Sequence, residues 1–268
     1  ETNDALDWAI QHRARSLLLV LSIGDTTSII TVLNTALRIP LGVIYGDDEI
    51  ELEWNALKTL IGSSQSHDGP DIVLHPTWKS AKATRASGTV LVTGSHTPAE
   101  LATILAAPKR LFAICSHSDG ASTFLGTANL CARVAGQPDK VNRKERADSL
   151  TCFNEDHCPR FKLSVSEADQ QGLLLSPEII SADVFLNLVC FGFPLGGALA
   201  RDLSLGRAFL NSGLIRSFVT TIGTVDVDSS VAFRAFLALR SGWTVGACVL
   251  QLNKEAHARN DSSFQYIL

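Results

Sequence analysis

The feature that most constrains the fold is a nearly continuous apolar run at residues 184–193, VFLNLVCFGF. Apolar side chains at successive positions are typical of a strand buried on both faces of a parallel sheet. Glycines and a proline follow this run, and a helical pattern begins near residue 197. A second apolar run, at residues 111–116, has the same form and ends at His117. The chain therefore predicts two buried parallel strands, each with a reactive side chain near its carboxyl end.

Strand-length apolar runs alternate with helical patterns along nearly the whole chain. Strands are expected at residues 16–21, 41–45, 71–75, 89–93, 217–222 and 264–268, and helices at residues 26–39, 47–61, 98–106, 197–212, 229–241 and 244–258. Residues 122–133 alternate in the manner of a hairpin, and residues 77–87 are expected to form a connection. This order predicts an α/β fold, with a mostly parallel sheet and helices on both faces. We expect one domain over residues 1–268, interrupted by a loop-rich insert at about residues 134–175.

The composition indicates a folded protein and excludes several classes. Hydrophobic residues make up 46% of the chain and charged residues 19%. The net charge of −4 gives no basic surface for nucleic acid, and no apolar run reaches the roughly 18 residues that a membrane span needs. The six cysteines lack disulfide-scaffold spacings and no signal-peptide pattern opens the chain, so a reducing, cytoplasmic location is expected. Because the chain begins at Glu1, we expect it to be a piece of a longer protein.

Cys190 and His117 are the candidate catalytic residues. If their strands are neighbours, a thiol and an imidazole meet at one edge of the sheet, as a cysteine hydrolase requires. A free thiol, with a pKa of about 8.5, is mostly protonated at neutral pH, so it needs a base such as His117. The backbone amides of Cys190 and of the turn after His117 would form an oxyanion hole. The alternative is that Cys190 only packs in the core, where free cysteines are common.

Two other kinds of site fit the sequence less well. Residue types that bind zinc occur at Cys131, Cys152, His157 and Cys158, but the spacing from Cys152 to Cys158 matches no compact zinc motif. The glycine-rich turn after Cys190 lacks the Lys-Ser/Thr pair and the G-x-G-x-x-G spacing of phosphate-binding loops. We therefore expect no metal and no cofactor.

Five short stretches resemble the CHAT domains of the caspase-like cysteine peptidase clan, which also holds separases, metacaspases and gingipains. ICSHSDG at residues 114–120 resembles the histidine motif, and LVC at residues 188–190, with the glycines that follow, resembles the cysteine motif. The other three are GTANLCAR at residues 126–133, NSGLIRSFVTTIGTVDVD at residues 211–228, and the helical segments from residue 234. The resemblance covers roughly residue 111 to the end, and the amino-terminal strands fit the rest of a caspase-like sheet.

The resemblance implies a cysteine endopeptidase with His117 as general base or acid and Cys190 as nucleophile. Such an enzyme hydrolyses a peptide bond through a thioester acyl-enzyme. Ser118 stands where many clan members have glycine, so its amide can still donate but with less backbone freedom. Leu188 stands where caspases and metacaspases have a polar or acidic residue in the S1 pocket, which argues against a strict charge preference there. The expected oxyanion and substrate contacts come from Ser118, Asp119, Asp183 and Gly192.

By the same resemblance, the partner is a protein substrate, cleaved once a sensor or helical-repeat module activates the domain, as in bacterial antiviral defence. The insert at residues 134–175 would then regulate the enzyme or contact the substrate. Two alternatives stay open: a catalytically inactive caspase-like module for interaction or signalling, and an α/β small-molecule enzyme with a structural cysteine. The presence of both His117 and Cys190 at strand ends favours the peptidase.

Overall fold

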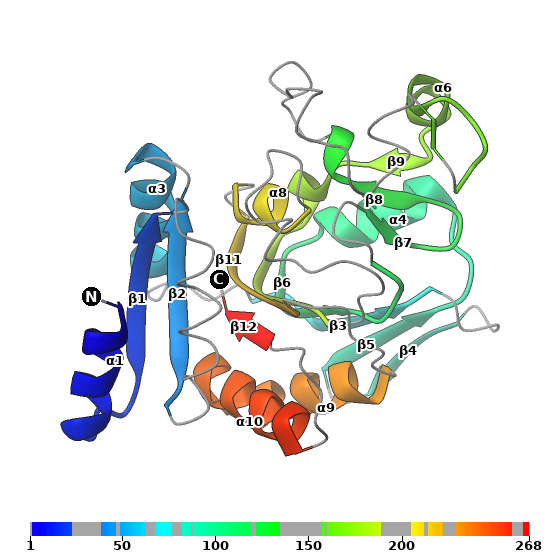
Figure 1. The fold of residues 1–268 in the computed structure, drawn as a ribbon. Helices are drawn as coiled ribbons and strands as arrows, with labels where there is room; N and C mark the ends of the chain where they lie inside the picture. The colour runs from blue at the N-terminus through cyan, green and yellow to red at the C-terminus, as the bar shows by residue number, and fades with distance from the viewer. Residues whose placement is uncertain are drawn as a thin grey trace.

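A seven-stranded sheet is the centre of the molecule. The computed structural model describes residues 2–22, 39–46, 49–62, 68–76, 82–86, 88–118, 122–134, 157–158, 160–188, 205–211, 214–221, 229–258 and 265–267. The strands of this sheet are β3 (Asp71–His75), β4 (Lys82–Ala86), β5 (Thr89–Thr93), β6 (Lys109–Ile114), β10 (Ala182–Asn187), β11 (Ile215–Thr221) and β12 (Gln265–Ile267). Their order across the sheet is β12-β11-β10-β6-β3-β5-β4 (Figure 1).

The sheet is parallel through its middle and antiparallel at both edges. The five strands β11, β10, β6, β3 and β5 run parallel to one another. At the two edges, β12 pairs with β11 and β4 pairs with β5 in the antiparallel sense. The central strands are buried, in agreement with their continuous apolar sequences. The predicted α/β fold is confirmed, and the arrangement is consistent with a caspase-like sheet.

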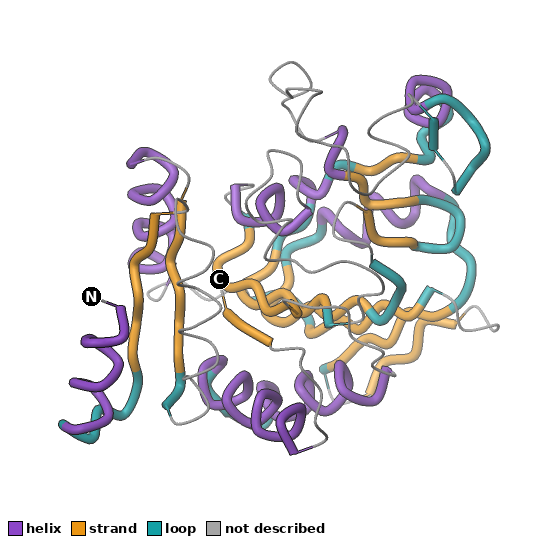
Figure 2. Tube along the Cα trace, in the orientation of Figure 1, coloured by secondary structure: helices purple, strands orange, loops and turns teal. Residues whose placement is uncertain are grey.

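Helices cover both faces of this sheet. Helices α4 (Pro98–Ala106) and α8 (Leu205–Asn211) lie on one face, and α9 (Ser229–Arg240) and α10 (Val245–Ala258) lie on the other (Figure 2). Each helix pair closes a separate buried apolar cluster against the strands. The predicted placement of helices on both faces is therefore confirmed.

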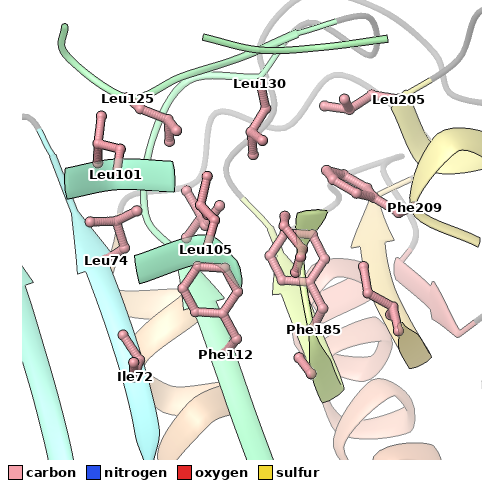
Figure 3. Close-up of a cluster of buried hydrophobic side chains, with 14 of the residues drawn as sticks. Ile72, Leu74, Leu101, Leu105, Phe112, Leu125, Leu130, Phe185, Leu205 and Phe209 are labelled. Atoms are coloured by element: carbon pink, nitrogen blue, oxygen red, sulfur yellow. The ribbon is translucent and has the colours of Figure 1, made fainter. Parts of the chain in front are cut away.

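Four phenylalanines form the centre of the cluster on the α4 and α8 face. The Phe185 ring stacks on Phe112 of β6 and Phe218 of β11, with centroids 5.3 and 5.5 Å away, and meets Phe209 of α8 edge-on at 4.8 Å. Leu101 and Leu105 of α4 complete the cluster over β6 (Figure 3). Full burial of such side chains is the main stabilising term for this layer.

A two-stranded parallel sheet lies beside the edge strand β12. It consists of β1 (Leu17–Ser22) and β2 (Leu41–Gly46), and β2 contacts β12 and α10. The helices α1 (Thr2–Gln11) and α3 (Glu49–Gly62) accompany it (Figure 1). Across the described residues, the helices are too short or too polar to cross a bilayer.

Three expectations about elements differ from the structure or lie beyond it. Residues 82–86, expected within a connection, form the edge strand β4. The second half of the insert, expected to be loop-rich, contains the helix α6 (Val165–Gln170) and the short strand β9 (Leu174–Leu175). The helix expected at residues 26–39 lies almost wholly outside the described residues.

Candidate active site

The strands that precede His117 and Cys190 are direct neighbours, which is the condition under which the sequence predicts that the two residues meet at one edge. Strands β6 and β10 pair in parallel with Ile114 opposite Asn187, the last residue of each strand. His117 follows Ile114 by three residues, and Cys190 follows Asn187 by three residues. The two candidate residues are therefore equally distant along the chain from one aligned pair. Cys190 itself lies outside the described residues, as do Asp119 and Gly192.

The backbone around His117 is held from two sides. The Cys115 N–H donates to the Leu74 carbonyl of β3 at 2.8 Å, which extends the sheet past the end of β6. The Phe124 N–H donates to the His117 carbonyl at 2.9 Å, and the Ser116 hydroxyl donates to the Phe124 carbonyl. Because these bonds fix the backbone, the His117 side chain starts from a defined position.

The Phe124 that holds the His117 carbonyl belongs to a small three-stranded sheet. Strands β7 (Ser122–Phe124) and β8 (Asn129–Cys131) form an antiparallel hairpin, and β9 pairs in parallel with β8. The hairpin turn is closed by the Leu125 N–H donating to the Ala128 carbonyl at 2.8 Å, with Gly126 at a φ of +87° that favours glycine. Leu125 and Leu130 point into the apolar cluster that also contains Leu101 (Figure 3). The predicted hairpin is confirmed, and it anchors the His117 segment to the core.

Side chains alternate between two sides of this pairing. Ser118 and Thr123 form a β-bridge and are both buried, whereas His117 is exposed. Residues directly opposite each other in an antiparallel pair place their side chains on the same side. Phe124, which lies opposite His117, therefore shares its outward side. The imidazole of His117 is therefore exposed, and the hydroxyls of Ser118 and Thr123 are buried.

Ser118 uses its side chain within the protein. Its Oγ accepts a hydrogen bond from the Thr123 hydroxyl at 3.0 Å and another from the Asn187 amide at 3.4 Å. With only 3% of the residue exposed, this hydroxyl does not face a substrate. Any oxyanion role expected of Ser118 therefore falls on its backbone amide, and that role stays a prediction.

A cation accompanies the outward side. The Arg160 guanidinium lies over the Phe124 ring, 4.9 Å from its centroid, and Arg160 is exposed. This arginine belongs to the insert, whose segment here is closed by a bridge between Cys158 and Leu163. The sequence offered no signal for it, because the contact depends on how the insert folds onto the β7 strand.

Asp183 does not lie at this edge. It is the second residue of β10, at the amino end of the strand, and its carboxylate pairs with Arg216 of β11 at 2.9 Å. Asp183 is four residue steps from Asn187, which places the two residues about 13 Å apart along the strand. The structure therefore places Asp183 with an ion pair at the opposite edge rather than beside His117.

Other cysteines are poor nucleophile candidates. Cys115, Cys131, Cys158 and Cys248 are free and buried. Burial raises the pKa of the Cys115 thiol to about 12 and, with help from Glu255, that of Cys248 to about 11. The thiols of Cys115 and Cys248 therefore stay protonated at neutral pH and act as small apolar side chains. Cys115 precedes His117 by only two residues, yet its environment makes it structural.

Leu188 has a packing role in the core. It is fully buried in the cluster beneath α9 and α10, so its side chain does not line a substrate pocket. Among the described residues, no three His, Cys, Asp or Glu side chains are grouped so that they could hold a metal ion.

Comparison with known proteins adds no relative. No protein-family model matches this chain, and a search of curated proteins finds no match either. The assignment to the CHAT domains thus stays a prediction that depends on the motifs and on the geometry of His117.

Proposed function

We propose that this chain is a cysteine endopeptidase of the caspase-like clan, resembling a CHAT domain, with His117 and Cys190 as its catalytic dyad. The observation that carries the proposal is the pairing of β6 with β10, in which His117 and Cys190 follow an aligned pair of residues at equal spacing. Carboxyl ends of neighbouring parallel strands meet at one edge of a sheet, where α/β proteins commonly bind their ligands.

The reaction follows from the two side chains. His117 accepts the proton of the Cys190 thiol, and the thiolate attacks the carbonyl carbon of the scissile peptide bond. Backbone amides, with that of Ser118 as one candidate, stabilise the oxyanion that forms. The tetrahedral intermediate collapses to a thioester as the amine leaves with the proton from His117. Water, deprotonated by His117, then hydrolyses the thioester to the carboxylic acid and restores the thiol.

The fixed backbone of His117 supports this role. A general base acts efficiently only when its ring is within hydrogen-bond reach of the proton that it takes. The bonds from Phe124 and Ser116, together with that from Cys115 to Leu74, hold the backbone without using the imidazole. The ring itself is exposed, as contact with a substrate requires.

The test is proteolysis of a peptide library by the wild-type chain, Cys190→Ala and His117→Ala. We expect both substitutions to lower kcat/KM by a factor of about 1,000 or more. Cys115→Ala is the matched control, because it removes a buried thiol close to His117 and should leave cleavage intact. Cleavage that survives Cys190→Ala would refute the proposal. A wild type that neither cleaves nor reacts with a peptide electrophile at Cys190 would favour the catalytically inactive module.

We further propose that the peptidase is a regulated effector, activated by a sensor or repeat module as in bacterial defence. The resemblance supports this point, and the insert bears on where regulation acts. Within residues 164–175, β9 pairs with β8 of the small sheet and α6 contacts β9. This part of the insert forms a fixed flank of the site, so the regulatory role falls on the earlier residues of the insert. Deletion of residues 137–149 should then change the activation requirement without abolishing cleavage.

A further inference from the structure

Three buried polar side chains are hydrogen-bonded to one another next to the His117 segment. Asn187 is the last residue of β10, Ser118 directly follows His117, and Thr123 belongs to β7. Their exposed fractions are 2%, 3% and 0% respectively. We call these residues the polar trio. It joins the strand that leads to Cys190 with the segment that carries His117, across 69 residues of sequence.

The hydrogen bonds of the polar trio form a closed triangle. The Asn187 Nδ2 donates to the Ser118 Oγ at 3.4 Å and to the Thr123 Oγ1 at 3.3 Å, and the Thr123 hydroxyl donates to the Ser118 Oγ at 3.0 Å. The two protons of the amide and the one proton of the threonine account for all three bonds. Each residue thus contacts both others, and none can rotate without breaking a bond.

Stability alone gives no reason for a polar trio at this place. Two of the bonds exceed the usual 2.9–3.0 Å, so each contributes about 1 kcal/mol or less. The surrounding cluster is apolar, including Leu125 and Leu130 of the hairpin, and apolar side chains would fill the same space without the cost of burying polar groups. What the triangle provides is directionality, because hydrogen bonds fix orientation where apolar contacts allow sliding.

Position along the chain shows what the triangle orients. Ser118 adjoins His117, and Asn187 precedes Cys190 by three residues. Thr123 adjoins Phe124, whose N–H holds the His117 carbonyl. We propose that Asn187, Ser118 and Thr123 act together as positioning residues that set the imidazole of His117 relative to the thiol of Cys190. This inference rests on the proposed peptidase function and adds residues that act through the dyad without touching substrate.

Thr123→Val is the most direct test, because it keeps the shape of the side chain and removes the hydroxyl from a fully buried site. We expect kcat to fall roughly 10- to 100-fold, as a misplacement of about 1 Å does in other sites, with KM changed less than about threefold. The rate of Cys190 alkylation by iodoacetamide should fall by a similar factor at pH 6.5. It should be unchanged at pH 9.5, where the thiolate forms without help from His117. Thr123→Ser retains the hydroxyl and should restore both readouts.

Phe185→Leu is the matched control for lost stability. Phe185 lies on β10 two residues before Asn187 and on the same face of the strand. Its contacts are apolar, with other rings of the core. The substitution should lower the Tm at least as much as Thr123→Val does, while kcat and the ratio of alkylation rates at the two pH values stay at wild-type levels. If Thr123→Val does not fold, Ser118→Ala removes the common acceptor and carries the same expectations.

The outcomes separate the two proposals. Unchanged kcat and an unchanged alkylation ratio in Thr123→Val, in a wild type that cleaves through Cys190, would overturn the role of the polar trio alone. A wild type in which Cys190 is inert to both substrate and iodoacetamide would overturn the peptidase proposal and the positioning role with it. A drop in kcat matched by Phe185→Leu would also overturn the positioning role, because it would trace to stability.

Discussion

At the scale of single residues, the candidate site depends on the pairing between the His117 segment and β7, and on which side of that pairing each side chain lies. Alternation along the strand turns Ser116 and Ser118 inward and His117 outward. The inward residues bond to the hairpin, whereas His117 and Phe124 lie on the outward side. One-residue slippage of this pairing would exchange the two sets. The bridge between Ser118 and Thr123 is therefore the contact that decides where the imidazole lies.

The first prediction concerns Arg160, whose guanidinium lies over Phe124 on this outward side. A fixed positive charge near the site should favour acidic substrates. We expect Arg160→Glu to lower kcat/KM about tenfold for peptides with acidic residues near the scissile bond, relative to otherwise identical basic peptides. The difference should shrink in 0.5 M salt, where charges are screened beyond roughly 4 Å. Arg234→Glu on α9 is the control, and an equal change for both peptide sets would contradict the prediction.

Residue positions were predictable from the sequence only where a strand end fixes them. His117 was found because an apolar run stops beside it. Asp183 was expected near the site because it precedes Cys190 by seven residues. An extended strand rises about 3.3 Å per residue, however, so Asp183 lies at the amino end of β10, far from the carboxyl end. Arg160, Thr123 and Asn187 were missed. Their roles come from pairings between distant segments, which no local pattern contains.

At the scale of elements, ion pairs join the amino ends of the central strands. The Asp71 carboxylate of β3 accepts two hydrogen bonds from the Arg110 guanidinium of β6, at 3.0 and 2.5 Å. Arg240, the last residue of α9, lies 3.7 Å from the same carboxylate. These hydrogen bonds raise the pKa of Arg110. The side chain of Asp71 is only 4% exposed, whereas that of Arg110 is 52% exposed, so a buried carboxylate connects two strands and a helix through partly solvated guanidinium groups.

The second prediction is that the Asp71–Arg110 pair couples β3 to β6. Asp71→Asn should lower the free energy of unfolding by about 2 kcal/mol, because it leaves charged donors without their carboxylate. A double-mutant cycle with Arg110→Gln should give a coupling energy of about 1–2 kcal/mol in urea denaturation. The more exposed pair of Arg234 and Glu255, at 3.0 Å, is the control and should give below about 1 kcal/mol. Equal coupling in both pairs would contradict the prediction.

Elements were predictable in proportion to their burial. The central strands and the helices α4, α9 and α10 lie close to the expected positions, because apolar periodicity marks them. Strand β4 was missed, since its sequence KATRA is polar, and an antiparallel edge strand needs no continuous apolar run. Helix α6 begins with a Ser164–Glu167 capping box, as α4 begins with a Thr97–Glu100 box. It was overlooked because six residues leave too short a periodic pattern.

At the scale of the whole molecule, the order of strands turns local signals into a site. The sequence predicted parallel strands but not that β6 and β10 would be neighbours, since strand order depends on crossovers that the sequence does not spell out. The structure pairs them near the middle of the sheet, with core helices above and below (Figure 1). A site at this edge is supported by the most buried part of the fold, whereas the two-stranded sheet of β1 and β2 lies at the far side, beside β12.

A buried lysine ties the stability of this core to pH. Lys109 opens β6 and is fully buried, with its Nζ donating to the carbonyls of Leu105 and Ala107 at the end of α4, at 2.7 and 2.5 Å. The ammonium also lies 4.8 Å from the centroid of the Phe112 ring. Burial lowers the pKa of Lys109 to about 7, even though these contacts favour the charged form. In the unfolded chain the same group has a pKa of about 10.4.

The third prediction follows from that difference. Between about pH 7 and pH 10 the unfolded chain binds more protons at Lys109 than the folded protein does, so stability from this group rises with pH. Urea unfolding at pH 6.5, 8 and 9.5 should show the wild type gaining on Lys109→Met by on the order of 1 kcal/mol per pH unit. Lys58, Cys115 and Cys248 are common to both proteins, so their titration cancels in this difference. A difference that stays constant over this pH range would contradict the prediction, because it would mean that the two carbonyls keep Lys109 protonated in the fold.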